Sequence, residues 1–303
     1  MIEVMKPGVY TTIQDLGRYG YQASGIVVSG VMDKRSYELG NIILQQQNAP
    51  AFEFVMTGPT LKFHQSAVIT ITGAAFQPTI DGQPISMWRP VQVLAGSILA
   101  IGSAKNGMYG YLFVKGLDIP QTLGSTSTYE KVGLGRRLQK GDTFHIISSY
   151  AKKVNWSLKP LNFDKHVTIR VVRGTEYDLF TEASLKQFFN TPYIVTPEAN
   201  RMGYRLQGVP LRQKIQHELL SSAVTYGTIQ VPPNGQPIIL MADRQTTGGY
   251  AKIAQVISTD LSTLAQCMPG TSILFKLVSL EEAQASLIRE HNAYRLLQKI
   301  IQF

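Results

Sequence analysis

One stretch of the chain concentrates the residue types that bind anions and move protons. It reads Ala-Asp-Arg-Gln-Thr-Thr-Gly-Gly-Tyr-Ala-Lys over residues 242–252 and directly follows the apolar run Pro-Ile-Ile-Leu-Met. Gly248 and Gly249 permit a sharp turn that brings backbone N–H groups close to an anion. The other chemical groups are two hydroxyls, a cation and a carboxylate that is a candidate base or metal ligand: Thr246, Thr247, Lys252 and Asp243. A simple hairpin loop also fits, but such a loop rarely carries so many polar groups beside a buried strand, so the segment predicts a functional site.

Two arginines flank a glycine in Asn-Arg-Met-Gly-Tyr-Arg-Leu, residues 200–206. In an extended segment Arg201, Gly203 and Arg205 would point to one face. Two neighbouring guanidinium groups form a fork that suits a carboxylate or a phosphate. A pair of salt-bridged arginines on a solvent face explains the same spacing, so both interpretations stay open.

Three further segments carry polar groups with simpler explanations. Asp15 and Arg18, in Asp-Leu-Gly-Arg, can pair with each other in a structural role. Ser29 and the following glycine come shortly before Asp33, which is typical of a turn and a helix cap. Residues 123–128 form a hydroxyl-rich loop, which by itself predicts only a solvated turn.

Common catalytic and metal-binding patterns are absent from the sequence. There is no His-Glu-x-x-His, no paired Cys-x-x-Cys, no Gly-x-Ser-x-Gly and no P-loop. The five histidines show no ligand spacing, so no metal site is predicted. The single cysteine, Cys267, allows no internal disulfide and follows an apolar helix face, so we expect a packed thiol.

The composition describes a folded chain without a nucleic-acid signature. Hydrophobic residues make up 44% and charged residues 16% of the 303 residues, which is sufficient for a full core. The excess of 29 Lys and Arg over 20 Asp and Glu is scattered and is not interleaved with aromatic residues, so we expect no nucleic-acid partner. No apolar run approaches the roughly 20 residues of a membrane span, and Glu3 and Pro7 interrupt any signal peptide. We therefore expect a cytoplasmic protein with no membrane partner.

The hydrophobic pattern predicts a mainly β fold with few helices. Short β-branched runs between turn residues predict strands at 67–72, 91–94, 98–101, 111–114, 144–147, 167–172, 193–196, 228–231, 238–241, 252–257 and 272–277. This spacing suits sandwiches or barrels and argues against a doubly wound nucleotide-binding fold.

Helices are predicted where capping residues precede apolar residues at helical spacing. One begins at Asp33 and runs to about residue 46, and a second begins at Thr175 or Glu176. A short one runs from Ser258 or Thr259 to Gln266. A last one begins at the capping box of Ser279 and Glu282 and is expected to dock on a barrel. A polar, Pro-containing stretch at 148–165 predicts a division into two β-rich domains, 1–150 and 151–303.

Taken in order, these motifs resemble the KipA family, which provides the C subunit of bacterial 5-oxoprolinase and is also called allophanate hydrolase subunit two. The family is related to the carboxyltransferase part of urea carboxylase. The resemblance begins in the segment Pro-Gly-Val-Tyr-Thr-Thr-Ile-Gln-Asp-Leu-Gly-Arg-Tyr-Gly-Tyr, residues 7–21, and continues to Gly270. Its most specific part is the 24-residue segment 227–250, which ends in Ala-Asp-Arg-Gln-Thr-Thr-Gly-Gly-Tyr.

The resemblance implies two cyclophilin-like β-barrel domains and a tight complex with a KipI-type B subunit and an A subunit. The implied reaction is the ATP-dependent opening of 5-oxo-L-proline to L-glutamate, with this chain inactive alone. ATP would act in the complex, at a site that the sequence does not locate. The implied catalytic residues are Asp243, Arg201, Arg205, Thr246 and Thr247. The implied substrate-binding residues are Gln245, Gly248, Gly249, Tyr250, Lys252, Gln230, Ser29, Asp33, Ser125 and Ser127.

Two alternatives remain open on the sequence alone. One is a biotin-dependent carboxyltransferase acting on urea or a similar amide, for which other proteins would supply biotin and the carboxylase. The other is a regulatory protein that binds a KipI-like kinase inhibitor and opposes it. Ala199 and Asn200 stand where relatives of the family usually carry a serine and an aspartate, which keeps the regulatory alternative in view.

Overall fold

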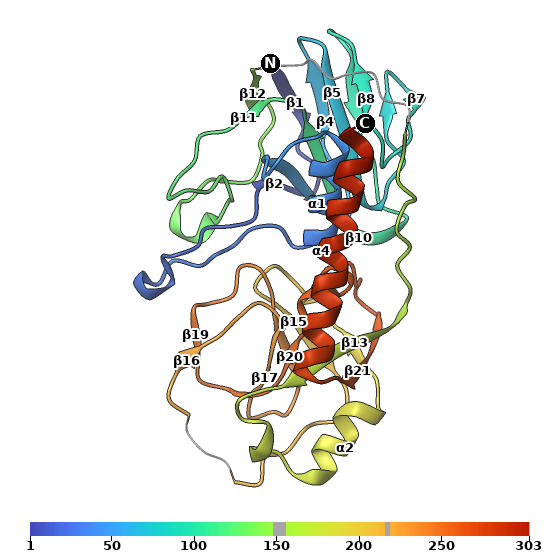
Figure 1. Ribbon diagram of the computed structural model, residues 1–303. Coiled ribbons are helices and arrows are strands. Elements are labelled where there is room, and N and C mark those ends of the chain that lie inside the picture. The colour runs from blue at the N-terminus through green and yellow to red at the C-terminus, as the bar shows by residue number, and fades with distance from the viewer. Residues whose placement is uncertain (148–155, 216–218, 303) are drawn as a thin grey trace. The chain divides into compact units, whose positions relative to one another are not determined.

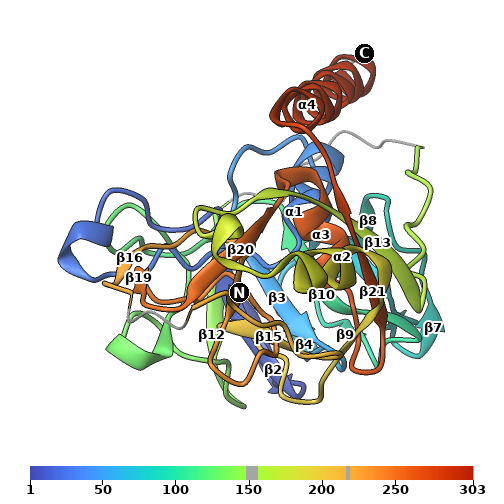
Figure 2. The ribbon, with the colours of Figure 1, turned by 90° about the horizontal axis from the view of Figure 1, so that it is seen from below.

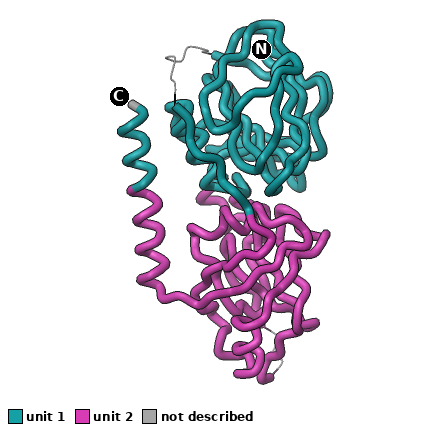
Figure 3. Tube along the Cα trace, turned by 90° about the vertical axis from the view of Figure 1, so that its right-hand side faces the viewer, with its two compact units in different colours: residues 1–18, 29–163, 293–303 teal, residues 19–28, 164–292 magenta. Residues whose placement is uncertain are grey.

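The fold is described from a computed structural model that covers residues 1–147, 156–215 and 219–302 (Figure 1). The chain divides into two compact units, which Figure 3 shows in two colours. Unit 1 comprises Met1–Arg18, Ser29–Phe163 and Ala293–Phe303, and unit 2 comprises Tyr19–Val28 and Asp164–Asn292. The predicted division at residue 150 lies among residues 148–155, outside the described part of the chain. Strands dominate both units, which confirms the mainly β fold class.

The described strands of unit 1 form two sheets. The larger, seven-stranded sheet contains, in spatial order, β11 (Leu117–Asp118), β12 (Thr143–Ile146), β1 (Ile2–Lys6), β4 (Thr60–Phe63), β9 (Ile98–Ala100), β6 (Thr79–Ile80) and β7 (Gln83–Pro84). The five-stranded sheet contains β2 (Tyr10–Gln14), β3 (Ala51–Val55), β10 (Asn106–Val114), β5 (Ala67–Ala75) and β8 (Val91–Val93). One apolar cluster draws Val4 and Leu61 from the first sheet and Phe52, Ile69 and Leu112 from the second, so the two sheets share a core.

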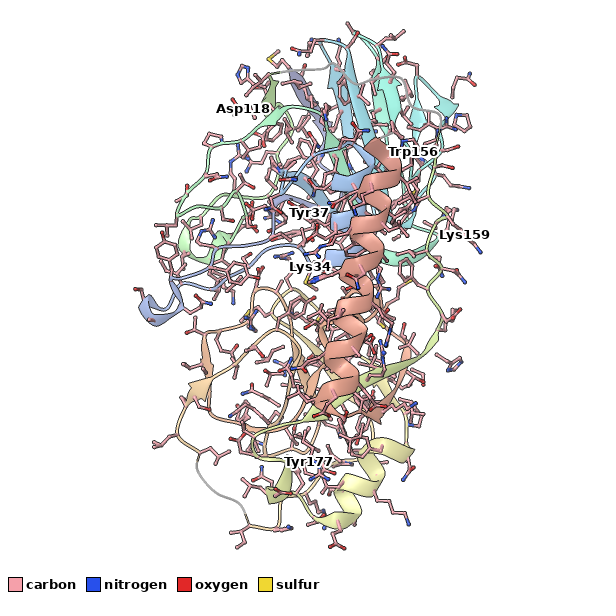
Figure 4. The ribbon with its side chains drawn as sticks, in the orientation of Figure 1. Lys34, Tyr37, Asp118, Trp156, Lys159 and Tyr177 are labelled. Carbon is pink, nitrogen blue, oxygen red and sulfur yellow. The ribbon has the colours of Figure 1, made fainter. Side chains whose placement is uncertain are left out.

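Helix α1 (Lys34–Ile43) covers β5 and β10 of unit 1. The predicted cap is confirmed, because the Asp33 carboxylate accepts a hydrogen bond from the Ser36 N–H at 3.0 Å. The helix ends at Ile43, before the predicted residue 46, because Gln45 has a positive φ of 53° that no helix continues through. Tyr37, labelled in Figure 4, is buried in this interface and donates its hydroxyl to the carbonyl of Ala49. A short 3₁₀ helix, η2 (Glu130–Val132), lies further along unit 1.

Unit 2 contains a closed barrel of seven strands within the described residues (Figures 1 and 2). Their spatial order is β13 (His166–Arg173), β20 (Ala251–Val256), β17 (Thr228–Val231), β18 (Ile238–Leu240), β15 (Gly203–Gln207), β14 (Tyr193–Val195) and β21 (Ser272–Leu277). The barrel closes through β13 and β21, which run parallel from the pair His166 and Ser272 to the pair Val171 and Leu277. A separate two-stranded ribbon joins β16 (Ser222–Ala223) to β19 (Thr247–Gly248).

Helix α2 (Glu182–Asn190) packs against β21 of the barrel (Figure 2). The predicted start at Thr175 or Glu176 was wrong. The hydroxyl of Thr181 accepts a hydrogen bond from the Ser184 N–H and so sets the start at Glu182, while the preceding residues form the 3₁₀ helix η3 (Tyr177–Leu179). The predicted helix near residue 258 is confirmed as η4 (Ser258–Asp260) followed by α3 (Leu261–Ala265). A further 3₁₀ helix of the unit is η1 (Gln22–Ser24).

The last helix, α4 (Leu280–Gln302), begins at the predicted capping box. The Ser279 N–H donates to a Glu282 carboxylate oxygen at 2.8 Å, and the Glu282 N–H donates to the Ser279 hydroxyl at 3.2 Å. Arg170 of β13 donates to the Ser286 hydroxyl, so the first part of α4 is hydrogen-bonded to the barrel of unit 2. No helix in residues 1–147, 156–215 or 219–302 is long and apolar enough to span a bilayer.

Candidate functional site

Residues 242–252 connect β18 to β20, two strands of the barrel of unit 2. They leave β18 after Leu240, form β19 of the surface ribbon, and enter the barrel again as β20. Asp243 is buried at the start of the segment, whereas Gln245, Thr247, Gly249 and Tyr250 are exposed and Thr246 is half-buried. The segment therefore has a fixed, buried base and an exposed tip.

The base of the segment is held by an ion pair between Arg201 and Asp243. The Arg201 Nε donates to one carboxylate oxygen at 2.7 Å and Nη2 donates to the other at 2.8 Å. The Asp243 N–H also donates to the Arg201 carbonyl at 2.7 Å. Both side chains are about nine-tenths buried, with 8% and 12% of their surface exposed. This two-point geometry fixes the path of the chain at Asp243.

Arg205 lies in a different setting from Arg201. It lies at an exposed position of β15 and its Nε is 3.1 Å from a carboxylate oxygen of Glu198, with more than half of each side chain exposed. The two arginines thus hold separate carboxylates of this chain, and the common fork expected from an extended segment is not formed, because Arg201 precedes β15.

Arg244 is a residue that the sequence analysis did not single out. It is mostly buried, and its Nη1 donates only long hydrogen bonds, of 3.4 and 3.5 Å, to the carbonyls of Met241 and Ala242. Its Nε has no hydrogen-bond partner among the described residues. Burial lowers the pKa of this guanidinium, and Tyr19, Tyr226 and Asp243 act in the opposite direction. Its position directly after Asp243 in the sequence is the signal that could have identified it as a candidate site residue.

Lys252 and Gln230 are neighbours across β20 and β17. The Lys252 Nζ lies 3.0 Å from a Glu176 carboxylate oxygen and donates to the Ser222 hydroxyl at 2.9 Å. Burial would raise the pKa of Glu176, but the hydrogen bonds from Lys252 and Thr175 outweigh it and lower the pKa. Lys252 is therefore an internal partner of Glu176 and Ser222.

Gln230 explains one of the two glycines in the segment. Its side chain is only 1% exposed, and its Nε2 has no hydrogen-bond partner in the described residues. A Cβ on Gly248 would lie 2.4 Å from that nitrogen, so a side chain at residue 248 would collide with Gln230. Gly248 has a packing role here.

The tip of the segment borders a cavity of about 550 Å³ in unit 2. Gly249, Tyr250 and Ala251 form one wall. The remaining lining is mostly apolar with two polar residues: Leu211, Leu219, Val231, Pro232, Pro233, Arg212 and Gln213. The Gln213 Oε1 is buried without a hydrogen-bond partner among the described residues. A cavity of this size is typical of a small-molecule site.

The predicted site residues of unit 1 are hydrogen-bonded within their own unit. The hydroxyls of Ser125 and Ser127 both donate to Asp15 Oδ1. The Ser29 hydroxyl donates to the Thr128 carbonyl at 3.0 Å, and Asp33 caps α1. Four of the predicted residues thus belong to unit 1, where they support the backbone around Asp15 and α1.

Neither a metal centre nor a reactive thiol emerges from the described residues. In residues 1–147, 156–215 and 219–302, no three His, Cys, Asp or Glu side chains gather in a way that could hold a metal ion. The Cys267 thiol is buried, and burial raises its pKa to about 12, in line with a packed thiol.

Comparison with known proteins places these features in a family. The model of the family "Carboxyltransferase domain, subdomain A and B" matches residues 24–277. The chain is 41% identical over 300 residues to the C subunit of 5-oxoprolinase from Haemophilus influenzae, covering 97% of this chain and 96% of that protein. It is 39% identical over 291 residues to the C subunit of 5-oxoprolinase from Escherichia coli, covering 93% of each.

A solved structure shares the fold over nearly the whole chain. The K. lactis urea amidolyase superposes with a TM-score of 0.90 at 28% identity, covering 98% of this chain and 20% of that protein. The chain thus corresponds to one portion of the larger enzyme and to nearly all of the two 5-oxoprolinase subunits. From its residues, its fold and these matches, the chain belongs to the carboxyltransferase domain, subdomain A and B, family and is a homologue of the 5-oxoprolinase C subunit.

Proposed function

We propose that this chain is the C subunit of an ATP-dependent 5-oxoprolinase that opens 5-oxo-L-proline to L-glutamate with B-type and A-type partner subunits. The observation that carries the proposal is the match of 41% and 39% identity, over nearly the full length, to two proteins named as C subunits of 5-oxoprolinase. Coupling to ATP suits the chemistry, because a lactam is a resonance-stabilised amide whose carbon needs activation before water attacks it.

The 242–252 segment is the part of this chain that we assign to the reaction. Arg201 accounts for both oxygens of Asp243, so the pair acts as an anchor that positions the following residues. Arg244, which keeps donor capacity, is our candidate for the substrate carboxylate. The hydroxyls of Thr246 and Thr247 and the backbone N–H groups of the two glycines are candidates for stabilising a developing oxyanion.

Carboxyl transfer of the urea carboxylase type is the second candidate function, favoured by the TM-score of 0.90 with the K. lactis urea amidolyase. That chemistry needs biotin as a carrier of the carboxyl group. The 550 Å³ cavity has room for a bicyclic urea, and its lining includes Gln213, whose Oε1 has no partner among the described residues and is our candidate acceptor for an N–H group. Leu211, Val231 and Gln213 would then hold the ring system.

An assay of the assembled complex separates the two functions. The chain is purified with its B-type and A-type partners and given ATP with either 5-oxoproline or urea, the latter with a biotinylated carrier and bicarbonate. Glutamate and ADP from 5-oxoproline, with no carboxylation of urea, support the proposal. Carboxylated urea without glutamate would replace it with the second function, and a stable complex inert with both would favour a regulatory role.

A further inference from the structure

Unit 1 contains a second cavity, of about 280 Å³, which the proposed function does not use. We name it the Arg18 cavity. Its lining includes Arg18, Thr126 and Ser127 on the polar side and Ile13, Leu138 and Phe144 on the apolar side. Its volume lies below the roughly 300 Å³ at which pockets for drug-sized ligands begin, so a ligand there would be small.

Arg18 is the unusual residue of this cavity, because a charged side chain is only 1% exposed. Its Nε donates to the Thr122 carbonyl at 3.1 Å. Its Nη2 donates to the carbonyls of Ser127 at 2.8 Å and Ser125 at 3.5 Å. Its Nη1 has no partner among the described residues. Because buried donors are nearly always satisfied in folded proteins, this nitrogen calls for an acceptor.

The nearby carboxylate of Asp15 is already committed to other donors. Its Oδ1 accepts from the Gly17 N–H and from the hydroxyls of Ser125 and Ser127. Its Oδ2 accepts from the N–H and the hydroxyl of Thr126. Asp15 thus offsets the charge of Arg18 at close range but supplies no acceptor to Nη1.

At the rim of the cavity, Arg136 is more than half exposed and is paired with a carboxylate of the same unit. Its two terminal nitrogens donate to the two carboxylate oxygens of Asp142 at 2.9 and 2.7 Å. Of the two lining arginines, Arg18 is the buried one, and its Nη1 has no partner among the described residues. A guanidinium nitrogen with two free N–H groups, walled partly by apolar side chains, is best satisfied by oxygens that carry negative charge.

We propose that the Arg18 cavity binds a small oxyanion, a carboxylate or a phosphate, whose oxygen accepts the Nη1 N–H groups of Arg18. The choice of natural oxyanion rests on the proposed function. In that reaction 5-oxoproline and glutamate carry a carboxylate, and ATP hydrolysis releases phosphate. Binding itself is a property of unit 1 and can be measured on the full chain without any partner or turnover.

The test is isothermal titration of the full chain with L-5-oxoproline, with L-glutamate and with inorganic phosphate. Thr143 is exposed on β12 and lines the cavity, so Thr143→Trp fills the space without altering Arg18. His145 is exposed on the same strand but is not part of the lining, so His145→Trp is the matched control. We expect Thr143→Trp to weaken binding by at least about tenfold and His145→Trp to leave it within about twofold.

A second variant, Arg18→Lys, removes the Nη1 donors and should also weaken binding by at least about tenfold in a chain that circular dichroism shows to be folded. Binding of phosphate alone identifies phosphate as the oxyanion, and binding of the two acids alone identifies a carboxylate. The proposal fails if the chain binds none of the three probes at millimolar concentration. It also fails if Thr143→Trp binds as tightly as the unaltered chain. In either case, glutamate formation by the assembled complex would still support the proposed function, because that assay does not depend on binding to the Arg18 cavity.

Discussion

At the scale of single residues, the candidate site rests on a buried ion pair. Arg201 and Asp243 form two hydrogen bonds and are nearly enclosed, so removing one charge breaks a buried, two-point ion pair. We expect Asp243→Asn to lower the free energy of unfolding by about 3–5 kcal/mol. Urea-induced unfolding followed by fluorescence measures this change.

The exposed pair of Arg205 and Glu198 provides the control for that prediction. Glu198→Gln should change the free energy of unfolding by about 1 kcal/mol or less, because solvent screens an exposed pair. Equal losses in the two variants would show that Asp243 does not anchor the segment.

A substitution of Arg244 should lower the activity of the complex without a matching loss of stability. Its guanidinium keeps an unpartnered Nε and makes only long contacts with two carbonyls. We expect Arg244→Gln in the assembled complex to reduce kcat/KM for 5-oxoproline by at least about tenfold, because it removes a charged contact with the substrate carboxylate. Arg173, which stacks on Tyr177 in the same unit, provides the control Arg173→Gln. A complex that assembles normally and keeps full kcat/KM with Arg244→Gln would remove this residue from the site.

The lowered pKa of Asp15 predicts how the stability of the chain responds to acid. Burial alone would raise the pKa of its carboxyl, but hydrogen bonds from Ser125, Ser127, Thr126 and Gly17 hold the pKa below its ordinary value. A pKa that is lower in the folded state than in the unfolded state stabilises the fold above the unfolded pKa, near about 4. That stabilisation is lost as the pH falls through the folded pKa.

We therefore expect the free energy of unfolding to fall steeply below about pH 4, and Asp15→Asn to flatten part of this dependence. Unfolding in urea at a series of pH values measures both curves. An identical slope in the two proteins below about pH 4 would contradict this account of Asp15.

At the scale of the elements, local sequence predicted strands well where β-branched residues are continuous. The strands at Thr228–Val231 and Ser272–Leu277 have the predicted bounds. Strand β15 was missed, because Gly203 and Arg205 weaken its β signal and its pairing with β14 and β18 decides the conformation. The start of α2 was misplaced, because Thr181 supplies the cap.

Helix α1 provides a prediction about packing between elements. Gly40 lies against Phe113 of β10, and a Cβ at residue 40 would come within 2.1 Å of the ring. Gly40→Ala should improve helix propensity and yet lower the free energy of unfolding by about 1–3 kcal/mol through overpacking.

The double variant Gly40→Ala with Phe113→Leu tests the cause of that loss. The smaller side chain at residue 113 should recover part of the stability, so the two changes should not add. Additive losses in thermal or urea unfolding would show that the contact with Phe113 is not responsible.

At the scale of the whole molecule, the sequence predicted β-rich domains but not how segments are shared between them. Residues 19–28 belong to unit 2 and residues 293–303 to unit 1, although each lies far along the chain from the rest of its unit. The candidate site shows the same limit. The composition of residues 242–252 identified the segment. The pairing of Asp243 with Arg201 depends on the closed barrel, so it could not be predicted from the local sequence.

Adding this chain back to its partners measures most directly whether it is a required part of a 5-oxoprolinase. Purified B-type and A-type proteins are incubated with 5-oxoproline and ATP while the chain is titrated in, and glutamate is quantified. We predict no glutamate without the chain and a rise that saturates at a fixed molar ratio of chain to partners. Full turnover by the partners alone, or no glutamate at any ratio although the complex forms, would contradict this assignment.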